Sequence, residues 1–205
     1  MKKKMRMFVA LLFVGVLFSS SLTVMAEELD YNSFNMYTMY EWVSDTCRLE
    51  GVTTSLNGVY STRNTRGLVV LSSQDAIRKT FNVPMYCGKE LSFKFYDTDA
   101  TKAPLAIDVI NQTAAGLGCQ VGPTVNIELG VAGSDGSYTL LPNDVGPVKM
   151  MIGIPEKFFD RNKTYAMICV REGGAISVYP DLDTNPWSVT FDTTGGYGTY
   201  AIVRY

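Results

Sequence analysis

The stretch Pro147-Val-Lys-Met-Met-Ile-Gly-Ile154 decides the fold class of this chain, because apolar side chains occupy every second position from Val148 onward. That alternation indicates a β-strand with one face buried. Further short β-rich runs, separated by turns rich in Gly, Asp, Asn and Pro, cover 164–171, 175–179, 188–192 and 199–205. Regular short strands with such turns predict an antiparallel meander over 136–205, forming one layer of a sandwich.

Residues 51–135 have the pattern of an α/β part that precedes this layer. Two β-rich runs on either side of Thr62-Arg-Asn-Thr-Arg66 predict an N-terminal hairpin. Ser72 or Ser73 is then expected to cap a short helix at 74–81.

The next three elements predict a βαβ-like unit. A strand at 91–96 is followed by a helix that begins near Pro104, and a second strand covers 125–131. The apolar stripe expected to bury this helix consists of Leu105, Val109, Ile110, Ala114 and Leu117. This order of elements favours a right-handed crossover between parallel strands. The fold class is therefore predicted to be α+β, with 51–205 as one compact unit.

The first 26 residues have the pattern of a secretory signal peptide. A basic start, Lys2-Lys-Lys-Met-Arg6, precedes an apolar run from Met7 to Phe18, and Val24-Met-Ala26 suits a signal peptidase. The apolar run is too short to span a membrane permanently. We expect a secreted, extracellular protein with no integral membrane segment after cleavage. Because no sorting tail follows the last strand-like run, free secretion is the expectation, with 27–50 as a partly ordered N-terminal extension.

Charge and composition exclude several functions. The chain has a formal net charge of −2, and the signal peptide holds four of its 18 basic residues and none of its 20 acidic ones, so the remainder is more acidic still. Without a Lys/Arg cluster, nucleic acid is not an expected partner. The chain has no histidine, no Gly-x-Ser-x-Gly and no phosphate-binding loop. We therefore expect no cofactor and no nucleophilic catalysis.

Four cysteines lie beyond the signal peptide, and an even number in a secreted chain suits two disulfides. Of the three possible connectivities we favour Cys47–Cys87 with Cys119–Cys169. The alternative is four reduced thiols, which suits a source that lives without oxygen. Their spacing does not resemble a zinc site.

Two groups of acidic residues are candidates for chemistry. Asp181, Asp183 and Asn185 place oxygens at positions 1, 3 and 5, as a calcium loop begins, but Pro186 stands where such a loop needs glycine. A hairpin turn is the stronger interpretation. Asp97 and Asp99 follow a strand and precede a helix, so they are candidates for acid/base chemistry or for helix capping.

Several strand patterns resemble a module found in secreted and cell-surface proteins of Gram-positive gut bacteria. Its "V-x-V-x-I-x-I-P" strand is similar to 146–155, its "Y-x-V-x-x-V-x-x-G" hairpin to 165–174, and its "F-x-x-Y-A-I-V" closing strand to 189–203. The run 55–61 is similar to the N-terminal part of small exported proteins with this ending. The resemblance covers about the last third of the chain, and it implies a fold and export rather than an activity.

The resulting hypothesis is a secreted bacterial protein that acts by binding or in a structural role, without catalysis. Exposed tyrosines would offer contact area for a cell-wall or host glycan or for a protein, and we expect them at Tyr60, Tyr179 and Tyr197. The alternative is an extracellular hydrolase that uses Asp97 and Asp99. A calcium-stabilised module is a third hypothesis.

Overall fold

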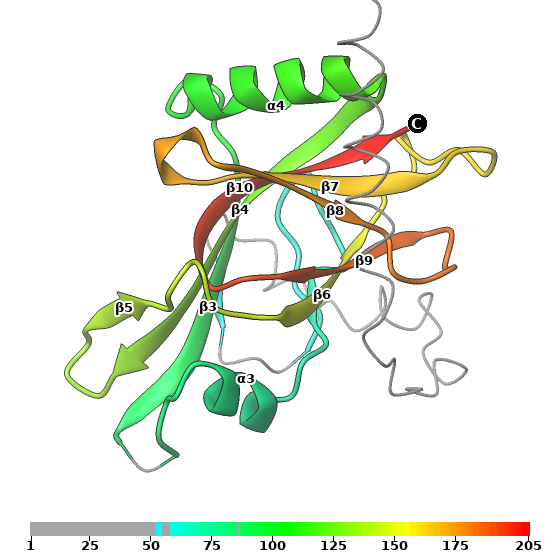
Figure 1. The fold of residues 1–205 in the computed structure, drawn as a ribbon. Coiled ribbons are helices and arrows are strands. Elements are labelled where there is room, and N and C mark those ends of the chain that lie inside the picture. Colours follow the sequence, from blue (N-terminus) through cyan, green and yellow to red (C-terminus); the bar gives the residue numbers. More distant parts are fainter. Residues whose placement is uncertain (1–51, 55–57, 86) are drawn as a thin grey trace, which may run out of the picture. The chain divides into compact units, whose positions relative to one another are not determined.

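Two antiparallel sheets form the framework of the chain (Figure 1). The computed structural model describes residues 52–54, 58–85 and 87–205. The larger sheet has seven strands in the order β1-β3-β4-β10-β7-β8, with β5 pairing to β4, and the smaller has the order β2-β6-β9. The strands are β1 (Val52–Thr54), β2 (Val69–Val70), β3 (Lys89–Asp97), β4 (Gln120–Gly133), β5 (Tyr138–Leu140), β6 (Val148–Gly153), β7 (Tyr165–Val170), β8 (Ile176–Pro180), β9 (Ser188–Thr193) and β10 (Gly196–Arg204). The helices are α3 (Gln74–Thr80), α4 (Pro104–Leu117) and the short 3₁₀ turn η3 (Glu172–Gly174).

The main core fills the space between the two sheets. On β6, the alternating residues Val148, Met150 and Ile152 are all fully buried, which confirms the pattern that predicted this strand. Phe93 and Phe95 of β3 enter the same core from the larger sheet. Each such side chain contributes roughly 1.5–3 kcal/mol on burial. The packing of two apolar faces makes the structure a β-rich α+β sandwich.

A second, smaller core lies on the outer face of the larger sheet, beneath α4 (Figure 1). Ile110 and Ala114 of α4 are buried there, and Gly118 ends the helix in the left-handed conformation at φ 71°. The predicted stripe is wrong at its ends, since Leu105 is 78% exposed and Leu117 is 38% exposed. Leu105 precedes Ile110 by five residues, which turns it roughly 140° round the helix and away from the sheet.

The predicted βαβ-like crossover is also wrong. Strands β3 and β4 are antiparallel neighbours, with Phe95 opposite Ile127 and Asp97 opposite Val125. Strand β4 begins at Gln120, beyond the end of β3, and α4 packs against β4, β7 and β10. The helix therefore returns the chain to the end of the sheet from which it left, and the order strand, helix, strand does not by itself fix the direction of the second strand.

The predicted C-terminal meander is divided between the two sheets. Strands β6 and β9 pair in the smaller sheet, whereas β7, β8 and β10 belong to the larger one. Strand β10 also pairs with β4, so the chain before and after residue 135 contributes to one sheet. All described residues belong to one compact unit.

The elements between 60 and 81 follow the sequence prediction in part. The predicted hairpin is reduced to a single bridge between Tyr60 and Leu68, after which β2 pairs with β6. The short helix is confirmed as α3, and the hydroxyl of Ser73 caps it by accepting a hydrogen bond from the Ala76 amide at 3.2 Å.

Candidate functional site

A tight turn at residues 62–65 lies at the end of β3, where Asp97 holds it in place. Asp97 Oδ1 accepts hydrogen bonds from the Thr62 hydroxyl at 2.6 Å and the Asn64 amide at 3.2 Å. Its Oδ2 accepts one from the Arg63 amide at 2.9 Å. Because both carboxylate oxygens bind this turn, the side chains of Arg63 and Asn64 are held at the surface, where both are exposed.

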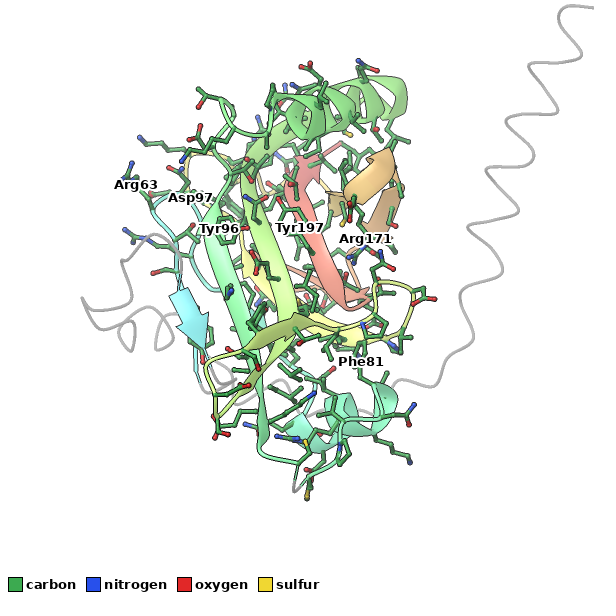
Figure 2. All side chains as sticks on the ribbon, turned by 90° about the vertical axis from the view of Figure 1, so that its left-hand side faces the viewer. Arg63, Phe81, Tyr96, Asp97, Arg171 and Tyr197 are labelled. Atoms are coloured by element: carbon green, nitrogen blue, oxygen red, sulfur yellow. The ribbon has the colours of Figure 1, made fainter. Side chains whose placement is uncertain are left out.

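One pocket, of about 640 Å³, lies between this turn and the sheet; we call it the polar pocket. Figure 2 shows Arg63 and Asp97 at one side of it and Tyr96 and Tyr197 on neighbouring parts of the sheet. Its lining is Arg63, Asn64, Tyr96, Asp97, Thr98, Asp99, Lys102, Ala103, Asn126 and Tyr197.

Hydroxyl and amide groups form a connected network on the floor of the polar pocket. Asn126 Oδ1 accepts hydrogen bonds from the hydroxyls of Tyr197 at 3.2 Å and Thr199 at 2.8 Å. The Tyr96 hydroxyl donates to Glu128 Oε1 at 2.8 Å. Burial and the neighbouring Glu128 carboxylate raise the pKa of Tyr96, so its hydroxyl stays protonated. The floor therefore presents neutral hydrogen-bonding groups on rigid strands.

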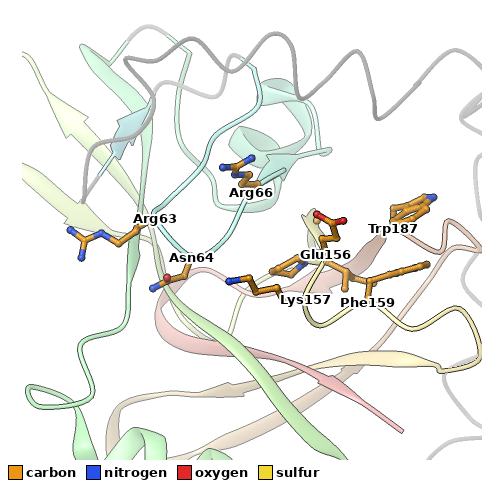
Figure 3. A pocket seen from close by; sticks show the side chains of 10 residues that line it. Arg63, Asn64, Arg66, Glu156, Lys157, Phe159 and Trp187 are labelled. Carbon is orange, nitrogen blue, oxygen red and sulfur yellow. The ribbon is translucent and has the colours of Figure 1, made fainter.

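A second pocket, of about 840 Å³, lies on the other side of the same turn; we call it the aromatic pocket (Figure 3). Its apolar part is the stacked pair Phe159 and Trp187, whose ring centroids are 3.9 Å apart with an interplanar angle of 17°. The lining is Arg63, Asn64, Arg66, Gly153, Ile154, Pro155, Glu156, Lys157, Phe159 and Trp187. Arg63 and Asn64 line both pockets, so the two are contiguous across the turn.

Positive charge predominates around the aromatic pocket. Among the residues that the structure describes, its lining has the cations Arg63, Arg66 and Lys157 and the carboxylate of Glu156. Among the described residues, the exposed side chains of Arg66, Glu156 and Lys157 form no ion pair or hydrogen bond. Figure 3 shows the Lys157 ammonium directed toward Asn64, at the junction with the polar pocket. Arg66 and Lys157 are therefore available to an anion that enters the pocket.

The structure places Asp97 and Asp99 in the polar pocket, with their oxygens engaged in local turns. Asp99 Oδ1 accepts hydrogen bonds from the amide and the hydroxyl of Thr101, at 2.9 and 2.6 Å, and Lys102 Nζ lies 3.5 Å from Oδ2. The Thr101 hydrogen bonds, and then Lys102, lower the pKa of Asp99. A lowered pKa suits a turn cap and opposes a general acid, which must hold its proton near neutral pH.

Of the three tyrosines expected at a binding surface, Tyr197 alone lines one of these two pockets. Tyr60 is only 8% exposed and stacks on Phe95 in the core, so the prediction of an exposed ring is wrong there. Its backbone bridges to Leu68, and its ring packs on Phe95 of β3. Tyr179 is half-buried against Phe191 of the core.

The weak calcium candidate Asp181, Asp183 and Asn185 forms a series of Asx turns. Asp181 Oδ1 accepts from the amides of Asp183 and Thr190, at 3.3 and 2.9 Å. Asp183 Oδ1 accepts from the Asn185 amide at 2.7 Å, and Asn185 Oδ1 from the Trp187 amide at 3.1 Å. Within the described part of the chain, no three His, Cys, Asp or Glu residues form a group that could hold a metal ion. These turns instead carry the chain to Trp187 and so position one wall of the aromatic pocket.

The same loop predicts a pH-dependent stability. Burial, reinforced by the neighbouring Asp183 carboxylate, raises the pKa of Asp181 from 3.8 to about 6. The folded chain then binds this proton more tightly than the unfolded chain, so the contribution of Asp181 to stability falls as pH rises from about 4 to about 6. Asp181→Asn retains Oδ1 as the acceptor and should remove this loss.

Urea denaturation at several pH values between 4 and 7 would measure this pH-dependent loss of stability. The difference in unfolding free energy between Asp181→Asn and the unchanged protein should grow across this interval and then level off. Asp108→Asn, at an exposed position of α4, is the matched control. A difference that stays constant with pH would contradict the prediction.

The cysteines do not form the favoured Cys119–Cys169 disulfide. Cys169 lies in the core between the sheets, whereas Cys119 packs beside α4 on the opposite face of the larger sheet, and both are free. Cys87 is free and exposed. Cys47 lies outside the described residues, as do the predicted signal peptide and the N-terminal extension.

Comparisons with known proteins give no relative for this fold or for its pockets. The sequence matches no protein-family model, and no curated protein or solved structure is significantly similar to the chain. None of the described helices is both long and apolar enough to cross a membrane. The site is therefore interpreted from its own residues.

Sequence reasoning missed the aromatic pocket altogether. Phe159 follows β6 in the loop 155–163, and Trp187 follows the Asx turns. The one available signal was an aromatic residue within four positions after a proline in each loop region, at Pro155-Glu-Lys-Phe-Phe159 and Pro186-Trp187. Nothing in the sequence indicates that these two loops contact each other in the fold.

Proposed function

We propose that this chain is a secreted, non-enzymatic binding module whose ligand lies across the aromatic and polar pockets. The observation that carries the proposal is their contiguity, because Arg63 and Asn64 line both. Together they offer an aromatic face, cations and a floor of hydroxyl and amide groups. A concave surface with apolar walls and a few convergent polar groups is the usual form of a ligand site.

The rigidity of the surrounding structure supports binding as well. The turn between the pockets is fixed to β3 through Asp97, and the floor of the polar pocket stands on β3, β4 and β10. A site built on strands loses little conformational entropy when a ligand binds. The secretory pattern of residues 1–26 supports an extracellular place of action.

The alternative hydrolase has less support. A carboxylate-dependent mechanism needs one group that stays protonated near neutral pH and a second that faces it across the scissile bond. The pKa of Asp99 is lowered, and both oxygens of Asp97 accept hydrogen bonds from the 62–65 turn. These contacts favour a structural role for both residues.

Trp187→Ala is expected to weaken ligand binding about tenfold or more, because it removes one of the two stacked rings of the aromatic pocket, and an aromatic contact is worth about 0.5–1.5 kcal/mol beyond its buried area. Retention of the purified protein on insoluble cell wall, mucin and common polysaccharides would identify the ligand source. A binding isotherm on that material would then give the affinity of each variant.

Tyr205→Ala, which removes a partly exposed ring outside both pockets, is the control and should bind as the unchanged protein does. Thermal unfolding of each variant separates lost binding from lost folding. Equal affinity of folded Trp187→Ala and unchanged protein would place the ligand elsewhere and overturn the proposed site.

A further inference from the structure

We propose that the ligand is an acidic polysaccharide, a chain of sugar rings that carry carboxylate groups. This inference rests on the binding function proposed above and names the chemical class that fits the two pockets.

The first argument is charge complementarity. The chain as a whole is acidic, with a formal net charge of −2, yet the described lining of the aromatic pocket has three cations and one carboxylate. Arg66 and Lys157 are exposed, and no ion pair or hydrogen bond among the described residues engages either side chain. Two unpaired cations, Arg66 and Lys157, beside one carboxylate on an acidic protein favour an anionic ligand. The planar guanidinium of Arg66 suits a carboxylate in particular, because it can donate two parallel hydrogen bonds.

The second argument is the combination of an aromatic face with hydrogen-bonding groups. A sugar ring has an apolar face of C–H groups and an edge of hydroxyls. Phe159 and Trp187 stack on each other and both line the aromatic pocket, so the outer face of a ring is the apolar surface that such a sugar face can cover. In the adjoining polar pocket, the Tyr197 hydroxyl and the Asn126 amide supply hydrogen-bonding groups for hydroxyls.

The third argument is the extended shape of the site. The two pockets meet at the 62–65 turn, so one ligand that contacts both must pass over Asn64. In the view of Figure 3, Arg63, Asn64, Lys157 and Phe159 follow one another from left to right. Such a row fits a linear chain with one unit at the aromatic pair and another in the polar pocket.

An acidic peptide fits less well. A peptide that binds in extended form usually pairs its backbone with a free strand edge. The backbone that lines the aromatic pocket is already paired: the Gly153 amide donates to Arg66 O at 3.0 Å, and the Ile154 amide donates to Trp187 O at 2.8 Å. These contacts favour a ligand that binds through its rings and charges.

The test compares polygalacturonate with its fully methyl-esterified form and with poly-glutamate, using the full chain in each binding assay. We expect polygalacturonate to bind at least about tenfold more tightly than either of the other two polymers, since they lack its carboxylates or its rings. We expect Arg66→Ala and Lys157→Ala each to weaken polygalacturonate binding several-fold and to reduce its dependence on salt. Arg161→Ala and Lys163→Ala, at exposed positions outside both pockets, are the matched controls and should have no effect.

Three results would overturn the inference. Equal binding of the esterified polymer would show that charge is not recognised. Equal binding of poly-glutamate would favour an acidic peptide. Binding of none of the three polymers would exclude this ligand class. The proposed function is judged separately, by whether Trp187→Ala weakens binding to whichever material retains the protein.

Discussion

Replacing Arg171 by methionine is expected to lower the free energy of unfolding by about 3–5 kcal/mol, because the change leaves several buried acceptors without a donor. Arg171 is only 9% exposed, at the end of β7 (Figure 2). Its guanidinium donates hydrogen bonds to the carbonyl oxygens of Gly195, Thr194 and Tyr197 and to the hydroxyls of Thr193, Thr194 and Tyr200. One side chain thus fixes the turn between β9 of the smaller sheet and β10 of the larger sheet.

No described carboxylate pairs with this cation, which makes its hydrogen bonds the main compensation for burial. Burial raises the pKa of the Cys169 thiol to about 11 and that of the Tyr200 hydroxyl well above its usual value, so neither neighbour supplies a negative charge near neutral pH. A buried cation with neutral acceptors depends on every one of them. Removing the cation and retaining the acceptors is therefore costly.

Urea denaturation followed by circular dichroism would measure this loss. Arg171→Lys, which keeps the charge but offers fewer donors in a different geometry, should fall between the methionine variant and the unchanged protein. Arg161→Met at an exposed position should change stability by less than about 0.5 kcal/mol. A loss for Arg171→Met as small as that of the exposed control would show that the network does not hold the two sheets together.

The sequence predicted strands and helices better than it predicted their partners. The alternation in β6 and the serine cap of α3 are local signals, and the structure has both elements where these signals stand. The direction of β4 relative to β3 depends on where α4 packs, and this packing is decided by contacts between residues far apart in the sequence. The division of the C-terminal strands between two sheets also depends on contacts between distant residues. Periodicity shows that one face of a strand is buried, but it does not show which sheet the strand joins.

The sequence was also a better guide to which side chains lie at the candidate site than to what they do there. The sequence singled out Asp97 and Tyr197, and both line the polar pocket. The sequence made Asp97 a candidate for acid/base chemistry, whereas in the structure its carboxylate accepts hydrogen bonds that hold the 62–65 turn. Arg66 and Trp187 come from turns more than a hundred residues apart in the sequence, and only the fold brings them to one pocket.

Phe191→Ala is expected to destabilise the chain by about 3–5 kcal/mol, the range found when a buried phenylalanine leaves a cavity. Phe191 lies on β9, is fully buried and lies opposite Met150 in the smaller sheet. Its ring centroid is 5.8 Å from that of Tyr179 and 5.9 Å from that of Tyr200, both of which belong to strands of the larger sheet. The ring therefore joins the two sheets, and its loss removes contacts from both.

Two further variants make the prediction specific to this position. Phe191→Leu fills part of the space, so it leaves a smaller cavity and should cost less than Phe191→Ala. Leu105→Ala removes an apolar side chain that is 78% exposed on α4 and should cost less than about 0.5 kcal/mol. The same denaturation experiment gives the free energy of unfolding of the three variants and so ranks their losses of stability. If Phe191→Ala lost no more stability than Leu105→Ala, the core between the sheets would not be the main source of stability, and the sandwich would have to be held together by its hydrogen-bonded turns.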